Sequence, residues 1–210
     1  MIFFLVSLLP AFLLLYFFRM GKFKQQLTLC VSFFLSVVFC TIVGLFGSSY
    51  RLTPASFFGN YFFFLFTQVI IPQVVLLVLF FLISKDSMDY KLLAIFPLLA
   101  GFYSVYLPFC VLFSDEALNA FTLFFKPVIF LCMLCGESVA FLCLAESIRK
   151  RKTSMIVLFC LILALILLTP SALDTLYVVG LAKSLWITFS VVYVGAISFY
   201  VFVFNRQVQK

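Results

Sequence analysis

The chain has 210 residues, of which 66% are hydrophobic and only 10% are charged. Soluble domains contain about 45–50% apolar residues, and a water-soluble fold would expose much of this excess, which soluble monomers rarely do. The net charge is +7, but Lys and Arg stand in short clusters between apolar runs instead of forming the continuous basic stripe that nucleic acid requires. The composition predicts a protein embedded in a lipid bilayer, with no nucleic-acid partner.

About seven apolar segments are long enough, or nearly so, to cross a bilayer. A span needs about 20 apolar residues, because each helical residue rises about 1.5 Å through a hydrocarbon core about 30 Å thick. Backbone groups in lipid must bond to one another, so each span is helical. We expect an all-α polytopic membrane helix bundle that forms a single integral membrane domain over residues 1–210. The spans are predicted at residues 2–18, 27–47, 61–83, 92–113, 127–147, 154–170 and 184–204.

The orientation follows from the distribution of basic residues. The first span is read as a retained helix and not a signal peptide, because it lacks a basic leader and a small-residue cleavage site before Arg19. Lys and Arg accumulate in cytoplasmic loops. With the N-terminus outside, only Arg51, Lys126 and Lys183 of the 14 Lys and Arg residues fall on the outer side. The sequence therefore predicts an N-terminus outside and a C-terminus in the cytoplasm.

The seven cysteines fall within or at the ends of apolar runs. Cys132 and Cys135 form a CxxC pair, but a zinc site needs further Cys or His ligands, and the chain has no histidine. We read the cysteines as small packing residues and expect no metal and no cofactor.

Small residues recur at every fourth position of the second span. Such a stripe lets another helix approach closely, which favours a packing face. A substrate path is the alternative, although small hydroxyls usually bond to the backbone of their own helix. The stripe consists of Thr28, Ser32, Ser36, Cys40, Gly44 and Ser48.

The third span carries Gln68, Pro72 and Gln73 near mid-bilayer. Pro72 has no N–H to donate to the carbonyl of Gln68, so a kink is expected there. A freed carbonyl beside two amides needs partners, so this place is either a polar structural knot or the lining of a cavity. Pro97 and Pro108 predict a second bent helix in the fourth span.

Glu137 lies at the centre of the fifth span. An ionised side chain there costs at least about 2.5–3.5 kcal/mol, and such residues usually face the bundle interior and mark function. The alternative is a protonated, structural glutamate bonded to Gln73 or a tyrosine. Glu146 lies near the inner surface, one turn before Arg149 and Lys150, and is expected to form an ordinary helix-end ion pair.

The opening stretch resembles the first helix of PrsW-type intramembrane proteases, which carries a similar LLPA run and ends in an aromatic and basic turn. The resemblance rests on Leu8-Leu9-Pro10-Ala11, continuing through Tyr16-Phe17-Phe18-Arg19 to Gly21-Lys22-Phe23-Lys24. It implies a glutamic-type membrane peptidase layout over most of the chain. The family's later helices carry motifs of the form EExxK, FxxxE and HxxxD.

The positions equivalent to these motifs lack most of the family's reactive side chains. The first motif falls on Pro72 and Gln73 and the second on Tyr106, so the acids are missing from both. The third falls on Pro170-Ser171-Ala172-Leu173-Asp174, which keeps the aspartate, while proline replaces the histidine. Glutamine has no titratable proton and proline no polar side chain, so neither can activate water.

The resemblance implies an inactive relative in a bacterial plasma (inner) membrane that binds membrane-anchored segments of single-span proteins. A displaced acid pair of Glu137 and Asp174 is the remaining route to catalysis. The alternative is a small permease or the substrate-binding membrane subunit of a transporter, because broken spans and a central glutamate suit a midplane site. A sensory or assembly module is a third interpretation and predicts tolerance of Glu137→Gln. Whether residues 171–183 are interfacial or re-entrant stays open.

Overall fold

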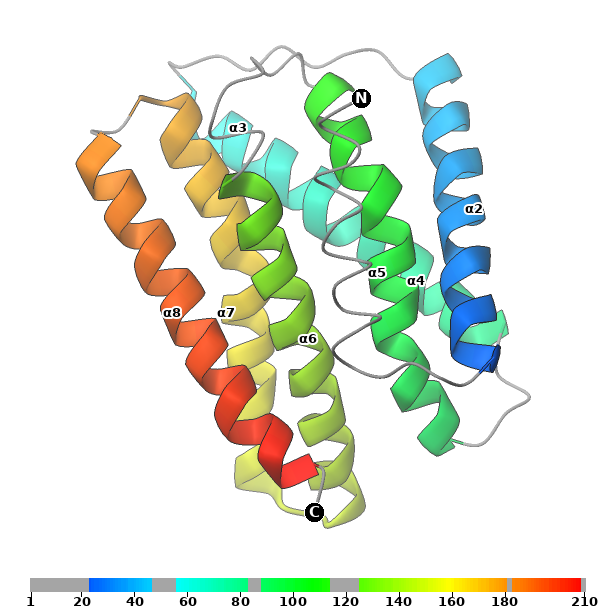
Figure 1. Cartoon of the computed structure of the whole chain (residues 1–210). Helices are drawn as coiled ribbons and strands as arrows, with labels where there is room; N and C mark the ends of the chain where they lie inside the picture. The colour runs from blue at the N-terminus through cyan, green and yellow to red at the C-terminus, as the bar shows by residue number, and fades with distance from the viewer. Residues whose placement is uncertain (1–22, 47–55, 83–87, 114–124, 181–182, 209–210) are drawn as a thin grey trace. The chain divides into compact units, whose positions relative to one another are not determined.

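The computed structural model describes residues 23–46, 56–82, 88–113, 125–180 and 183–208, and every regular element in this part of the chain is a helix (Figure 1). The predicted all-α class is confirmed. In chain order the elements are α2 (Phe23–Phe46), α3 (Phe57–Phe64), the π-helical segment η1 (Leu65–Ile70), α4 (Ile71–Leu82), α5 (Met88–Phe113), α6 (Lys126–Arg149), α7 (Thr153–Val178) and α8 (Lys183–Val208).

Five described helical stretches are long and apolar enough to cross a membrane, namely Gln26–Leu45, Phe57–Val78, Lys126–Arg149, Thr153–Val178 and Ser184–Val203. A shorter apolar helix covers Pro97–Cys110, within the predicted fourth span. The first predicted span, residues 2–18, lies outside the described residues. The structure thus supports a membrane protein, while seven spans, the orientation and a single domain over 1–210 stay predictions.

Two details differ from the sequence prediction. The sixth span was expected to end at Pro170, but α7 continues through this proline to Val178. The first part of the stretch 171–183 is therefore the end of a continuous helix and not a re-entrant segment. Lys126, assigned to an outer loop, begins α6 and is only 1% exposed, so it carries less weight in the charge asymmetry.

The helix continues past Pro170 because a neighbouring side chain replaces the lost backbone donor. Proline has no N–H for the carbonyl four residues earlier, which belongs to Ile166. The hydroxyl of Tyr193 on α8 donates to that carbonyl at 2.9 Å. Neighbouring helices commonly satisfy the backbone around a proline in this way in membrane proteins.

The described helices fall into two compact units. The first contains α2, α4, α5 and the start of α6, and the second contains α3, most of η1, the rest of α6, α7 and α8. The chain changes unit between Leu52 and Thr53, between Val69 and Ile70, and between Val128 and Ile129.

In the first unit, α2 packs along α5, which continues through both of its prolines (Figure 1). Thr28, Ser32, Ser36 and Cys40 of the small-residue stripe are buried, which confirms a packing face. The prediction of hydroxyl bonds within the same helix is wrong for two of them. Ser32 donates to the carbonyl of Leu98 at 2.6 Å, and Ser36 donates to that of Phe102 at 2.8 Å. Ser48 lies outside the described residues.

Gly101 sets how closely these two helices approach. A Cβ atom at this position would lie 2.5 Å from the carbonyl oxygen of Leu29 and 3.1 Å from Cβ of Ser32. The first contact is too short for any side chain at residue 101, and the second would require Ser32 to shift by a few tenths of an ångström. The α2–α5 pair is therefore built on close backbone approach, the usual way that helices associate in lipid.

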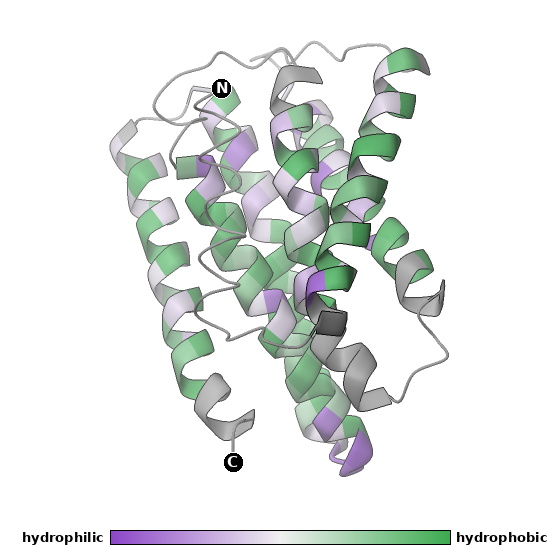
Figure 2. Ribbon diagram, turned by 45° about the vertical axis from the view of Figure 1, so that its right-hand side comes forward, coloured by the Kyte–Doolittle hydropathy of each residue, from purple (hydrophilic) through white to green (hydrophobic). Residues whose placement is uncertain are grey.

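In the second unit, α6, α7 and α8 pack together around Gly136, where an added Cβ would meet Ile166 of α7 and Ile197 of α8. Further along, Val139, Cys143 and Phe159 form a buried apolar cluster. Large apolar side chains cover the outer faces of α7 and α8, and Figure 2 shows these faces as predominantly hydrophobic. Such faces suit contact with lipid chains.

Candidate functional site

A buried polar seam joins α3 and η1 to α7 within the second unit. Nε2 of Gln68 donates a hydrogen bond of 2.8 Å to Oδ2 of Asp174, and both side chains are about 2% exposed. Asn60 on α3, and Ser171 and Thr175 on α7, are fully buried on the same pair of packed helices. Burying such groups is unfavourable unless they bond to one another. Of these five residues, which we call the polar seam, Gln68 and Asp174 form a specific polar contact between the helices.

One hydroxyl of the seam is left without a partner. Oγ1 of Thr175 donates to the carbonyl of Ser171 at 2.7 Å, as threonines in helices often do. Oγ of Ser171 is fully buried and makes no hydrogen bond within the described part of the chain. A buried polar atom of this kind costs about 1–3 kcal/mol, and functional positions are one of the places where proteins retain such atoms.

The seam includes a disturbance in the third predicted span. We expected a kink at Pro72, and the structure places the π-helical turn Leu65–Ile70 directly before it. A π-helical turn pairs a carbonyl with the residue five positions later, so this pattern would pair the carbonyl of Gln68 with the N–H of Gln73 and not with the donor that Pro72 lacks. Because Gln68 lies in this turn and binds Asp174, the polar-knot interpretation is favoured for Gln68. π-helical turns are also frequent at functional sites.

The end of α7 that carries Asp174 is held by α8. Nε1 of Trp186 donates to the carbonyl of Leu173 at 3.1 Å, and the rings of Trp186 and Tyr177 are 5.6 Å apart. Trp186 and Tyr193 were not predicted from the sequence. Each is an aromatic residue with a hydrogen-bond donor on the helix that follows a proline-containing span, and this pattern could have identified them.

Glu137 is fully buried on α6, as expected for an acid that faces the bundle interior. It follows Gly136, which packs against Ile166, and it is close enough to Tyr193 to interact electrostatically with the phenol. Gln73, the other partner considered from the sequence, belongs to the first unit.

The two acids of the second unit stand at different levels of the helix packing. Glu137 lies beside the contact between Gly136 and Ile166. Asp174 lies eight residues further along α7 than Ile166, which corresponds to about 12 Å along the helix axis. Groups that exchange a proton must lie within about 2.6–3.2 Å of each other or of one bridging water. Glu137 and Asp174 thus belong to different levels of this packing, and their action as a displaced acid pair stays a prediction.

The motif-equivalent positions divide between the units. Pro72, Gln73 and Tyr106 lie in the first unit, whereas Pro170 and Asp174 lie in the second. Pro72 is buried and Gln73 is half-buried on α4.

Tyr106 belongs to an aromatic cluster of the first unit. Its ring centroid lies 5.1 Å from that of Phe102 and 5.9 Å from that of Phe39, and its side chain is only 3% exposed. The ring packs at distances typical of favourable aromatic pairs. At this position the family motif has an acid, and the structure has a packed phenol.

A groove of about 520 Å³ opens between α6 and α8 in the second unit. Its floor includes the small side chains of Cys132, Cys135 and Ser198, and both thiols are free. Two thiols fall short of the four ligands of a zinc site, and the described residues contain no group of three or more potential metal ligands. The full lining is Leu131, Cys132, Cys135, Ile197, Ser198, Val201 and Phe202.

Comparison with known proteins yields no match, whether to a protein-family model, to a curated protein or to a solved structure. The resemblance to PrsW-type proteases stays a prediction, and residues 8–22 of the stretch that carries it lie outside the described part of the chain.

Proposed function

We propose that the chain is a multi-pass bacterial plasma-membrane protein of the PrsW type that has lost proteolytic activity and binds single membrane-spanning helices of partner proteins. The N-terminus lies outside and the C-terminus in the cytoplasm in this proposal, as the basic residues predict. The observation that supports it most directly is the arrangement of the buried carboxyl groups in the second unit.

Loss of catalysis is supported by what each carboxyl group contacts. Peptide hydrolysis by two acids requires one to activate water while the other donates a proton, at hydrogen-bonding distance from the same reacting centre. Asp174 accepts a hydrogen bond from the neutral amide of Gln68. It lies about 12 Å further along α7 than Ile166, the residue that packs against Gly136 beside Glu137. The equivalents of the first two motifs hold Gln73 and Tyr106, which cannot replace a glutamate pair.

Binding of a helix is supported by the groove between α6 and α8. Both helices are candidate membrane spans, so an occupant of the groove must come from within the bilayer. Helices in lipid associate where small side chains allow close approach, and Cys132, Cys135 and Ser198 provide such a surface.

A small permease is a second candidate because of one observation in the polar seam. The hydroxyl of Ser171 is buried without a hydrogen-bond partner on the helix face that carries Asp174, next to a π-helical turn. Broken helices with polar side chains at mid-depth are typical of transporter sites. In this case solute uptake into proteoliposomes would depend on Asp174, whereas helix binding would not.

The test uses the full chain in proteoliposomes with two synthetic single-span peptides, one with a small-xxx-small face and one with leucine in those positions. We expect the first peptide alone to give energy transfer from a labelled protein. Cys135→Phe, which fills the groove, should abolish the signal. Cys160→Phe, the same change at an exposed position of α7, should leave it intact.

Proteolysis is followed in the same samples by mass spectrometry. Both peptides should stay intact over the same period with the wild-type protein and with the Glu137→Gln and Asp174→Asn variants. Cleavage that disappears in either variant would overturn the loss of catalysis. Equal binding of the two peptides, or binding that survives Cys135→Phe, would overturn helix recognition at the groove.

A further inference from the structure

The turn between α6 and α7 presents four consecutive basic residues, Arg149 to Lys152. All four side chains are exposed. Both flanking helices are candidate membrane spans that end or begin directly at this turn, so it lies at the membrane surface. Figure 2 shows the turn as strongly hydrophilic beside the apolar helices.

The backbone of this turn is fixed by a helix-ending hydrogen-bond pattern. The N–H of Lys152 donates to the carbonyl of Ser147 at 3.0 Å, and the N–H of Arg151 donates to that of Ile148 at 3.0 Å. This is the Schellman arrangement, in which the residue after the helix cap adopts a left-handed conformation. Arg151 occupies that position, with φ of 52°.

Arginine is an unfavourable residue at this position. Glycine usually occupies it, because a side chain raises the energy of the left-handed conformation. In the described part of the chain, Arg151 is the one residue other than glycine with positive φ. Such an outlier points to a role for the side chain. Glycine at position 151 would preserve the turn, and the other three basic residues would still lie beside the membrane.

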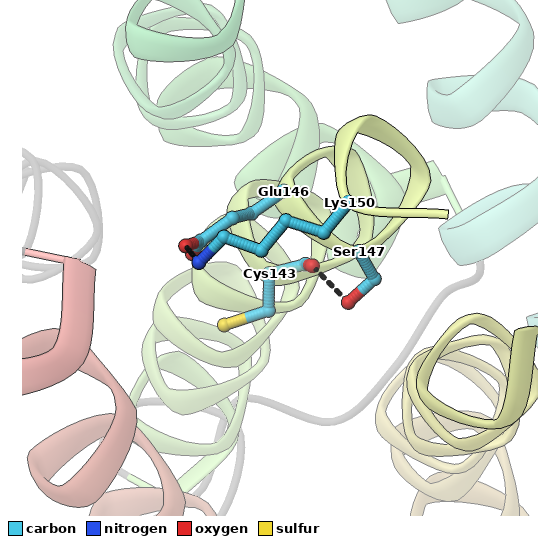
Figure 3. Close-up of polar contacts among 4 residues, drawn as sticks. All are labelled: Cys143, Glu146, Ser147 and Lys150. Carbon is cyan, nitrogen blue, oxygen red and sulfur yellow. Dashed lines mark hydrogen bonds and ion pairs between the residues drawn. The ribbon is translucent and has the colours of Figure 1, made fainter. Parts of the chain in front are cut away.

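The local charge is only partly neutralised. Lys150 pairs with Glu146 one turn earlier, as the sequence predicted, and Oγ of Ser147 donates to the carbonyl of Cys143 (Figure 3). The first turn of α7 contains no acidic residue. No ion pair within the described residues involves Arg151 or Lys152, so their charges face the surroundings.

We propose that the turn Arg149–Lys152 binds the phosphate groups of anionic phospholipids in the adjacent leaflet. Clusters of four or more basic residues directly beside a membrane span are typical of such binding. Arginine suits phosphate because its guanidinium donates two parallel hydrogen bonds. The left-handed backbone at Arg151 supports lipid binding over a purely topogenic role, because the orienting effect of loop charge does not depend on backbone conformation.

The test titrates dioctanoyl-phosphatidylglycerol into the full chain in a neutral detergent, with dioctanoyl-phosphatidylcholine and inorganic phosphate as separate probes. We expect saturable binding of phosphatidylglycerol, weakened by salt, and much weaker binding of the other two. Arg151→Gly and Arg151→Asn should each weaken phosphatidylglycerol binding about fivefold. Both should leave the melting temperature unchanged or higher, because Gly and Asn tolerate positive φ.

Glu146→Gln is the matched control of opposite sign. It removes the partner of Lys150 and should tighten phosphatidylglycerol binding. Wild-type affinity in both Arg151 variants, equal binding of phosphatidylcholine, or binding of inorganic phosphate as tight as that of phosphatidylglycerol would each overturn the proposal.

Discussion

The bond between Gln68 and Asp174 predicts a measurable coupling between two helices that are far apart in the sequence. Gln68→Leu removes the amide that donates to Oδ2 of Asp174 at 2.8 Å while roughly keeping the side-chain volume. Leaving a buried acceptor without its donor costs about 1–3 kcal/mol in proteins generally. Polar pairs in membranes average about 0.6 kcal/mol, with a maximum of about 1.7 kcal/mol, because unfolded helices also find partners in lipid.

We expect a coupling near the upper end of the membrane range, about 1–1.7 kcal/mol, because both side chains are almost completely buried. The measurement is a double-mutant cycle with Gln68→Leu, Asp174→Leu and the double variant, unfolded reversibly in mixed micelles. The chain has a single tryptophan, Trp186, which bonds to the carbonyl of Leu173 beside Asp174. Its fluorescence therefore reports on this end of α7.

Thr188→Leu combined with Asp174→Leu is the control, because Thr188 is an exposed residue of the same unit whose hydroxyl donates to the carbonyl of Ser184 within α8. Its coupling to Asp174 is expected to lie within about 0.3–0.5 kcal/mol of zero, as for independent sites. A coupling between Gln68 and Asp174 that also lies within about 0.3–0.5 kcal/mol of zero would refute the buried hydrogen bond as the link between η1 and α7.

Two further predictions concern helix packing. Tyr193→Phe should destabilise the second unit by about 0.5–1.5 kcal/mol, measured by reversible unfolding. The loss should be smaller in a Pro170→Ala background, because alanine supplies the missing backbone N–H. An equal loss of stability in both backgrounds would contradict the role given to the hydroxyl. Gly101→Ala should lower the melting temperature, since its Cβ would lie 2.5 Å from a carbonyl oxygen. At Gly195 an added Cβ would have no atom within 4 Å, so Gly195→Ala should stabilise α8 by about 0.5–1 kcal/mol. A higher melting temperature for Gly101→Ala than for Gly195→Ala would refute the close approach of α2 and α5.

Hydrophobic runs predicted the helices well because lipid leaves the backbone no alternative to helix. The prediction failed at the end of α7, where Pro170 marked a local stop. The donor that lets the helix continue is the hydroxyl of Tyr193, which lies on another helix. A rule based on neighbouring residues cannot detect a compensation that depends on tertiary contact.

The candidate site was visible as separate residues and not as a group. Glu137 was correctly expected in the interior because a charge in lipid is costly. Gln68 stood out because Pro72 cannot donate to its carbonyl, and Asp174 because it keeps the aspartate of the third motif. Their pairing spans 106 positions and depends on how α3 and α7 pack. The left-handed Arg151 had no signal at all, because that position normally shows itself as glycine.

The π-helical turn before Pro72 has a consequence for changes in chain length. Such a turn holds one residue more than an α-helical turn, so deleting a single residue within Leu65–Ile70 would return the segment to ordinary α-helix with both flanks facing as before. That shorter helix would bring the proline ring against the carbonyl four residues earlier. Replacement of Pro72 by alanine is therefore expected to rescue the deletion, because alanine has no ring to clash and restores the backbone N–H.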